Sequence, residues 1–228
     1  GAVVAVSKDI RRGVLGVPGM NYSTLLRRSV DFDIFSVPMY AAYPDDLERD
    51  IALSLMQMLW DRSENNGYAQ HMTDNTALRG PDNEILLHPA FGDHQVTMWS
   101  ADVMARTLGA SVDRSLISPE RREPVGFNNP ELPGFSAMDY RNPAQAAGSL
   151  LMYWDEVWPD AQVQDCEGYS TPPPPIGNQP PRLGDDPHEC ARREVAGRCQ
   201  KSHFLRPDGR LVDVRDRGVV PEDCPPLR

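Results

Sequence analysis

Short apolar runs alternate along the chain with longer segments of helical periodicity. The first run, residues 14–17, is stopped by Pro18 and has the profile of a strand that is buried on both faces. Residues 85–88 and 149–154 form two more runs of strand length. Strands that alternate with helices predict an α/β fold, in which a mostly parallel sheet is covered by flanking helices.

Four segments predict helices. Residues 1–10 resemble the second half of one, and a helix of about 96–108 ends at Gly109, a residue typical of the position after a helix. A turn at 185–188 leads into another. The clearest helix follows Asp45 or Asp46, either of which can cap it. Its apolar residues share one face and are expected in the core: Ile51, Leu55, Met58, Leu59.

The spacing of these elements divides the chain. Residues 20–80 lie between two predicted strands and are a candidate cap insertion, and residues 111–143 have the composition of loops. Residues 159–184 form a Pro-rich excursion of extended character. Residues 211–214 are a candidate edge strand, and 215–228 form a polar tail rich in Cys and Pro.

Composition excludes two classes of partner. The 228 residues carry a net charge of -10, which repels phosphate backbones and argues against nucleic acid. No apolar run approaches the roughly 18 residues that a transmembrane helix requires. The hydrophobic content of 40% is sufficient for a globular core.

All four cysteines lie in the last third, at Cys166, Cys190, Cys199 and Cys224, and none forms a CxxC pair. An even number in a Pro-rich region predicts disulfides and a secreted or cell-envelope protein, with Cys199–Cys224 the favoured pair because it would tie down the tail. The alternative is a cytoplasmic protein with four free thiols.

Asp93 and His188 follow successive predicted strands. Functional side chains of such sheets gather beyond the carboxyl ends of the strands, so we expect the Asp93 carboxylate within hydrogen-bond reach of the His188 ring. The alternatives are a solvated turn acid and an ordinary loop histidine.

The same segments resemble a known superfamily. The segments "LLHPAFGDHQV", "SLLMYW" and "DDPHECARR" look like the acid turn, last core strand and histidine turn of an α/β-hydrolase. Together with "GVLGVPGMNYSTLL" they are similar to large actinobacterial and proteobacterial esterase-like and lipase-like hydrolases. The resemblance spans most of residues 1–214 and implies the carboxyl-terminal part of such a domain.

The resemblance implies roles for the pair. A serine hydroxyl needs a base to accept its proton, and a carboxylate to orient that base. Asp93 would orient His188, His188 would serve as the base, and no cofactor is required. The substrate would be a small-molecule or lipid-like carboxylic ester.

The nucleophile of this pattern is missing. The sequence contains no G-x-S-x-G, and neither Ser7 nor Ser23 has the flanking glycines of a nucleophile turn. The turn is expected at or before Gly1, so the partner of this chain would be the amino-terminal half of the same domain. Residues 1–228 alone are therefore expected to be inactive.

Other candidates carry less specific signals. His94 adjoins the acid and is expected to support the site, whereas His71, His88 and His94 form an alternative metal-binding set. His203 is expected to pack in the last helix. Tyr22 and Trp60 are candidates for an apolar acyl pocket, or for an aromatic core beneath a long loop.

Two other functions remain open. A non-catalytic binding or surface-interaction protein could use the same fold, and an amidase or peptidase could use the same triad. Ester and amide substrates both pass through a tetrahedral oxyanion, which the sequence does not distinguish.

Overall fold

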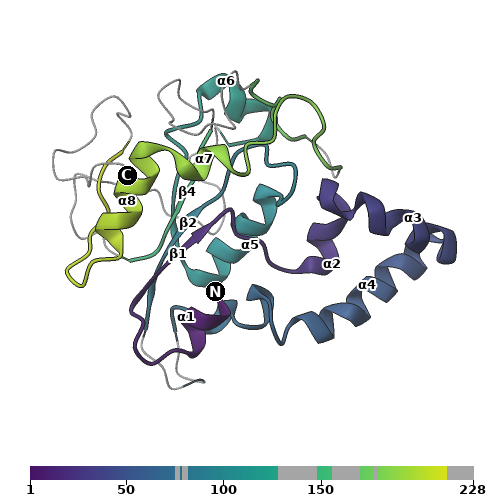
Figure 1. Cartoon of the computed structure of the whole chain (residues 1–228), viewed down its shortest axis with the longest axis horizontal. Helices are drawn as coiled ribbons and strands as arrows, with labels where there is room; N and C mark the ends of the chain where they lie inside the picture. The colour runs from purple at the N-terminus through teal and green to yellow at the C-terminus, as the bar shows by residue number, and fades with distance from the viewer. Residues whose placement is uncertain (75–77, 79–81, 128–147, 156–169, 177–178, 215–228) are drawn as a thin grey trace.

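The computed structural model describes residues 1–74, 78, 82–127, 148–155, 170–176 and 179–214 (Figure 1). Within these residues one sheet has the strand order β1-β2-β4-β3, and every neighbouring pair is parallel. The strands are β1 Arg12–Gly16, β2 Glu84–His88, β3 Ser111–Asp113 and β4 Leu150–Met152. The predicted α/β class with a parallel sheet is confirmed.

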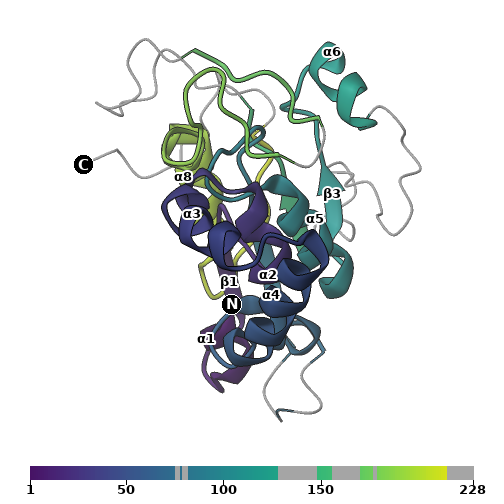
Figure 2. The same ribbon diagram turned by 90° about the vertical axis from the view of Figure 1, so that its right-hand side faces the viewer.

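Helices cover both faces of this sheet, as Figure 2 shows for α5 and α8 on opposite sides. Ile85 and Leu87 of β2 belong to the cluster that includes α1 (Ala2–Val6) and α5 (Met98–Leu108). Leu86 belongs to the opposite cluster, with α8 (Val195–Phe204). Burial of alternate side chains against two layers explains why the middle of β2, Ile85 to Leu87, is apolar without interruption.

The spacing of apolar residues on α5 explains its packing. Its residues Ala101, Met104, Ala105 and Leu108 are buried and recur at helical intervals. Gly109 ends the helix in the left-handed conformation with φ of 66°, where a glycine avoids the strain of a side chain. The predicted helix and its stop signal are both confirmed.

The insertion between β1 and β2 is helical. We call α3, α4 and the turn between them the helical arm (residues 33–60). Asp45 caps α4, accepting hydrogen bonds from the backbone N–H groups of Leu47 and Glu48 at 2.8 and 3.2 Å, as predicted. The elements of the insertion are α2 Tyr22–Leu25, η1 Leu26–Arg28, η2 Val30–Phe32, α3 Asp33–Ala42, α4 Asp46–Trp60, η3 Asn65–Gly67 and η4 Ala69–His71.

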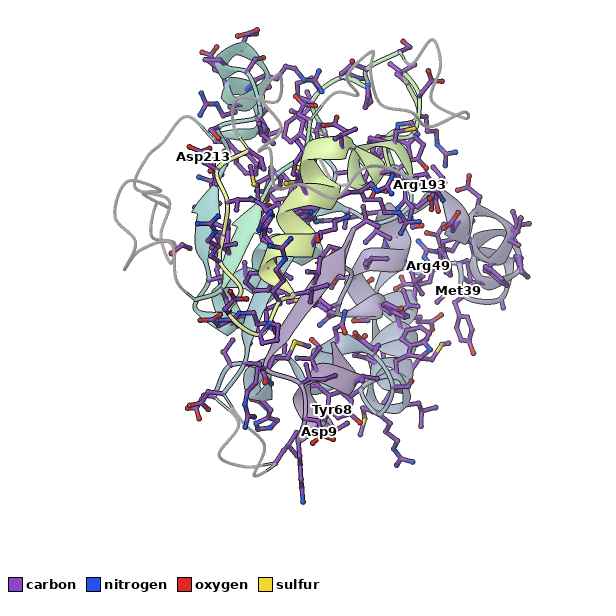
Figure 3. The ribbon with its side chains drawn as sticks, turned by 60° about the vertical axis from the view of Figure 1, so that its left-hand side comes forward. Asp9, Met39, Arg49, Tyr68, Arg193 and Asp213 are labelled. Atoms are coloured by element: carbon purple, nitrogen blue, oxygen red, sulfur yellow. The ribbon has the colours of Figure 1, made fainter. Side chains whose placement is uncertain are left out.

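The predicted core face of α4 is wrong. The four residues expected in the core are exposed, and the buried residues of this helix are Leu53 and Gln57. The arm leads away from the sheet (Figure 1), and Figure 3 shows its residues Met39 and Arg49 at one side of the molecule. The apolar stripe therefore has no core to face in the described part of the chain.

Two strand predictions also need correction. Strand β1 was expected to be buried on both faces, but it lies at the edge of the sheet, and only Gly13 among its residues is buried. Residues 211–214 form no strand, although Leu211, Val212 and Val214 are buried in the cluster around α8. The Val212 carbonyl accepts a side-chain bond from Gln200 at 3.0 Å instead of joining a ladder.

The predicted loop at 111–143 contains β3 and two short helices, α6 Pro119–Arg122 and η5 Glu123–Val125, while 128–147 lie outside the described residues. Of the Pro-rich excursion, residues 170–176 and 179–184 are described and form neither helix nor ladder. The tail at 215–228 is outside the described residues. No helix within the described ranges is long and apolar enough to cross a membrane.

Candidate active site

The acid turn extends from the end of β2. Beyond the strand, Phe91 N donates to the Trp154 carbonyl at 2.7 Å, so the chain stays beside the continuation of β4. Gly92 then takes a φ of 87°, and a Cβ there would lie 2.9 Å from Cγ of Pro172. Glycine is required by both the backbone conformation and the close approach. The turn places Asp93 at the carboxyl edge of the sheet.

The Asp93 carboxylate is buried and held by the backbone. Its Oδ1 accepts hydrogen bonds from the N–H groups of Gln95 and Val96, both at 2.8 Å. Burial raises the pKa of the Asp93 carboxyl, and the bond and charge of His188 act to lower it. The charge of Asp186 raises that pKa further.

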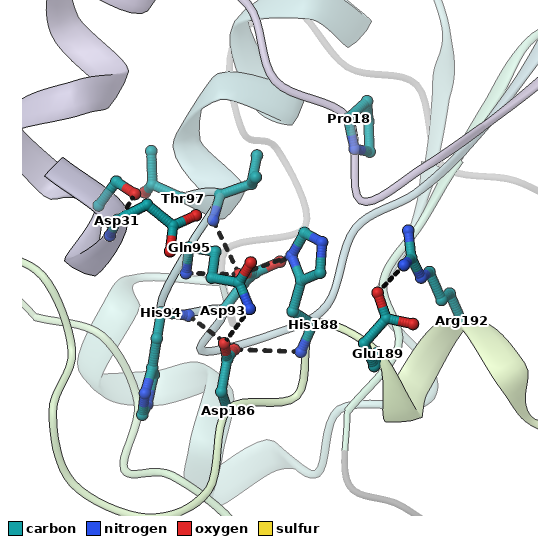
Figure 4. A network of polar contacts seen from close by, with 12 residues as sticks. Pro18, Asp31, Asp93, His94, Gln95, Thr97, Asp186, His188, Glu189 and Arg192 are labelled. Atoms are coloured by element: carbon teal, nitrogen blue, oxygen red, sulfur yellow. Dashed lines mark hydrogen bonds and ion pairs between the residues drawn. The ribbon is translucent and has the colours of Figure 1, made fainter. Parts of the chain in front are cut away.

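His188 lies against this carboxylate, as predicted (Figure 4). Its Nδ1 is 3.0 Å from Oδ2 and 3.2 Å from Oδ1 of Asp93, and the two side chains are 14% and 1% exposed. The predicted contact between acid and imidazole is confirmed. A carboxylate beside Nδ1 places the proton of the neutral ring on that nitrogen, which leaves Nε2 as the basic one.

The second ring nitrogen is available for chemistry. Within the described part of the chain, His188 Nε2 has no hydrogen-bond partner. In Figure 4 the ring extends toward the loop of Pro18, which follows β1. One side of the imidazole is thus fixed by an acid, and the other faces the loop at the end of the edge strand.

The loop after β1 contains a backbone outlier. Val17 has φ of 44°, in the left-handed region that β-branched residues avoid. It is held there by its N–H, which donates to the His88 carbonyl at 2.8 Å. Such conformations cluster at functional sites, so the backbone of Val17 is consistent with a site at this loop. The periodicity of the sequence did not reveal this feature.

His94 supports the site through its main chain. Its N–H donates to Asp186 at 3.1 Å, and its carbonyl accepts from Val30 N at 3.0 Å. Its ring is buried, and Nε2 has no partner among the described residues. His88 lies in β2 and donates from Nε2 to Gln200 at 2.6 Å, whereas His203 is buried in α8.

The alternative metal set is not assembled as a cluster. Among the described residues, no group of three His, Cys, Asp or Glu side chains could hold a metal ion. His71 ends η4, with its ring against Gln70, and His88 is engaged by Gln200. The residues therefore give no metal centre to build on.

Tyr22 and Trp60 contact each other, with ring centroids 5.9 Å apart. Neither ring makes a hydrogen bond or ring contact with the Asp93–His188 pair in the described structure. A hollow of about 330 Å³ lies nearby, between α2 and α4. Its lining residues are Ser23, Thr24, Arg27, Arg28, Asp50 and Ser54. The role of Tyr22 and Trp60 in binding an acyl group stays a prediction.

Neither serine weighed as a nucleophile approaches the pair through a hydrogen bond. Ser23 Oγ donates to Asn21 Oδ1 at 2.6 Å, and Ser7 Oγ accepts from Asp9 N at 3.3 Å. Neither Cys190 nor Cys199 is a free thiol. Cys166 and Cys224 lie outside the described residues, so the Cys199–Cys224 pairing stays a prediction.

Three contacts around the site were not anticipated from the sequence. Arg121 donates to both oxygens of the buried Asp155 at 2.6 and 3.0 Å, and to the Pro172 carbonyl at 2.8 Å. This arginine fixes the Pro-rich segment over the acid turn. Asp186 joins the two turns of the pair. The acidic segment "GDDPHE" indicated a structured turn around Asp186 but did not predict the partners of that side chain.

Comparison of the chain with protein-family models, with curated proteins and with solved structures gives no match.

Proposed function

We propose that Asp93 and His188 are the orienting acid and the general base of a serine-hydrolase reaction on carboxylic esters, of small-molecule or lipid-like type. One observation carries the proposal: His188 Nδ1 lies 3.0 Å from a buried carboxylate while its Nε2 is left without a partner in the described residues. A ring held in this way is oriented to exchange a proton at Nε2.

The proton transfers follow from this orientation. As a serine oxygen attacks the ester carbonyl, His188 Nε2 takes the hydroxyl proton, and the buried Asp93 stabilises the resulting imidazolium. Collapse of the tetrahedral oxyanion breaks the ester bond, and the same proton goes to the departing alcohol. Water then repeats the sequence on the acyl-enzyme, which releases the acid and regenerates serine.

The serine is proposed to come from a strand that pairs with β1. The outer edge of β1 carries no partner in the described residues, and Val14 and Leu15 are only half-buried there. A parallel strand at that edge would end beside the loop of Pro18, on the side to which the His188 ring extends. The resemblance to α/β-hydrolases supports a strand–turn–helix nucleophile at this position.

A fluorophosphonate probe tests this proposal. The natural polypeptide, including any sequence that precedes Gly1, and the 228-residue chain are treated with the probe and assayed on p-nitrophenyl esters. We expect one labelled serine in the former, loss of labelling with His188→Ala, and no labelling of the latter. Labelling of Ser7 or Ser23 in the 228-residue chain would contradict it.

A non-catalytic binding protein is the second candidate. It is favoured by the absence of G-x-S-x-G from the sequence, and by the lack of a hydroxyl or thiol bonded to His188 Nε2 in the described structure. In that case the pair would serve as a buried ion-pair latch between two turns. Failure of the natural polypeptide to label or to hydrolyse esters, with the Asp93–His188 contact intact, would select this function.

A further inference from the structure

One carboxylate joins the turn of the acid to the turn of the histidine. Asp186 Oδ1 accepts hydrogen bonds from the backbone N–H groups of His94 and His188, each at 3.1 Å. Its Oδ2 accepts from the Gln95 side-chain amide at 2.7 Å. Figure 4 shows Asp186 between the two turns, directly beside the pair. Its donors come from residues adjacent to Asp93 and from His188 itself.

We propose that Asp186 is a positioning residue for the Asp93–His188 pair, fixing the distance between the two turns and placing a second negative charge beside the imidazole. The proposal rests on the proposed function for its catalytic consequence. Its structural content, the coupling of Asp186 to the pair, is independent of any reaction.

An ordinary turn accounts for only part of this arrangement. An aspartate often accepts a hydrogen bond from the N–H two residues later, which explains the bond to His188 N. It does not explain the bonds to His94 N and to Gln95, which lie 92 and 91 residues away in sequence. Pro187 separates Asp186 from His188 and fixes its own φ, so the carboxylate and the imidazole are joined by a stiff link.

The charge of Asp186 acts in the same direction as its geometry. Repulsion between the carboxylate of Asp186 and that of the buried Asp93 raises the pKa of the Asp93 carboxyl. Other ionisable side chains around the pair are Asp31, His94, Asp185, Glu189 and Arg192. Unlike Asp31, Asp185 and Glu189, Asp186 accepts hydrogen bonds from both turns.

The neighbouring Asp185 provides a matched control. It has the same charge, but its carboxylate accepts from Ser170 N at 2.6 Å, on the Pro-rich segment rather than on the pair. Asp185→Asn and Asp186→Asn therefore remove equal charge one residue apart. A general effect of removing an acidic charge would appear in both variants, whereas loss of the coupling proposed here would appear only in Asp186→Asn.

The test is a pH titration of the 228-residue chain by NMR, which requires no activity. In the unsubstituted protein, the amide protons of His94 and His188 should shift together with one midpoint, that of the Asp186 carboxyl. Asp186→Asn should lower the pKa of Asp93 and should broaden or remove the downfield signal of the His188 Nδ1 proton. Asp185→Asn should leave that signal in place. Far-UV circular dichroism checks that both variants fold.

The outcomes separate this inference from the proposed function. Different midpoints for the two amides, or an Nδ1 proton signal indifferent to Asp186→Asn, would overturn the positioning role. Should Asp186→Asn not fold, the amide titration of the unsubstituted protein still decides. Coupled titration in a polypeptide without esterase activity would support the positioning role while rejecting the ester hydrolase. In an active polypeptide, Asp186→Asn should lower kcat by up to about 100-fold, as for a misplacement of about 1 Å.

Discussion

The turns that carry Asp93 and His188 differ from the helical arm in what holds them in place. The acid turn is buried at the carboxyl end of the sheet, the histidine turn is half-buried beside it, and bonds between residues far apart in sequence fix both. The arm has almost the reverse character. Val37 is 73% exposed and Leu55 is 61% exposed, and α3, which the structure describes in full, buries none of its residues.

The difference shows which forces shape each region. Polar bonds between distant residues, made in a buried setting, give the turns one geometry. The arm relies more on local terms, such as the Asp45 cap and the Arg49 side chain, which donates to the Tyr43 and Pro44 carbonyls at 2.8 Å. Its α4 is also tied to α2, since Gln57 accepts from Ser23 N at 2.9 Å. Exposed apolar patches of this kind are uncommon on monomeric soluble proteins.

The two regions meet at the root of the arm. Val30 N donates to the His94 carbonyl beside the acid turn, and Asp33 at the start of α3 pairs with Arg182 at 2.8 Å. The exposed pair contributes little to stability. Of these two contacts, the main-chain bond of Val30, which lies just before the arm, is therefore the principal polar link to the site, and substitutions within the arm should leave the pair undisturbed.

The largest expected effect is on catalysis by the natural polypeptide. His188→Ala should lower kcat for ester hydrolysis by on the order of 10⁴-fold, because it removes the base that accepts the serine proton. Asp93→Asn should lower it by a comparable factor, through the wrong tautomer of the imidazole. Steady-state assays with p-nitrophenyl esters measure both.

An arm substitution sets the scale for this comparison. Phe35→Ala should leave kcat within a few-fold of the unsubstituted enzyme if the arm is independent of the pair. Full activity after both site substitutions would refute the triad assignment. A large loss from Phe35→Ala would show that the arm takes part in the reaction.

The next effect is on stability, measured with the same substitution in the two regions. Leu87→Ala in the buried β2 strand should lower the free energy of unfolding by about 2–5 kcal/mol, because it leaves a cavity between packed layers. Leu55→Ala in the arm should change it by less than about 0.5 kcal/mol. Urea unfolding followed by circular dichroism gives both values. Equal losses would mean that something covers the arm in solution.

These two leucines also show the limits of the sequence as a guide. The apolar run of β2 predicts a strand because few other structures bury three consecutive apolar residues and the residue after them. The stripe on α4 has equally regular spacing, and periodicity predicts which residues share a face but not what lies against it. The core assignment of Leu55 failed for that reason, as did the assignment of β1 as a strand buried on both faces.

The sequence likewise predicted only part of the candidate site. The order of strand, acid, strand and histidine was sufficient to pair Asp93 with His188. Asp186 could not be assigned its partners, because its bonds depend on how two loops approach each other in space. The left-handed Val17 is likewise a product of the tertiary structure, since the sequence around it predicts only a strand and its end.

Two buried groups, His88 in β2 and Asp102 in α5, make opposite contributions to stability as pH changes. Burial lowers the pKa of His88 to about 3, so its neutral form stabilises the fold above pH 6.5, and this stability is lost as pH falls. Burial raises the pKa of Asp102 to about 6, so its contribution is present below pH 3.8 and is lost as pH rises through 6. Between about pH 4 and 6 the two contributions oppose each other.

Removal of either ionisable group should leave the pH dependence of the other visible in the stability of the protein. His88→Gln should make the protein relatively more stable on acidification from pH 6 to 4.5, and Asp102→Asn relatively less stable. In each variant the slope of the free energy of unfolding against pH should change by up to about 1.4 kcal/mol per pH unit. Urea unfolding at several pH values in this range measures the slope, with His71→Gln as a control outside β2 and α5. Parallel pH profiles for all three variants would contradict the assignments.

The smallest expected effect is confined to the arm. Asp45→Ala removes the cap that accepts from Leu47 N and Glu48 N, which should weaken α4 by about 0.5–2 kcal/mol. Because the arm adds little to the global core, we expect amide exchange at these two residues to become about 2- to 30-fold faster. Exchange within α5 and the urea midpoint should not change. Asp45→Asn is the matched control, since asparagine caps as well as aspartate but carries no charge. Unchanged exchange in Asp45→Ala would mean that packing, rather than capping, holds α4, and the contrast between arm and site would then fail.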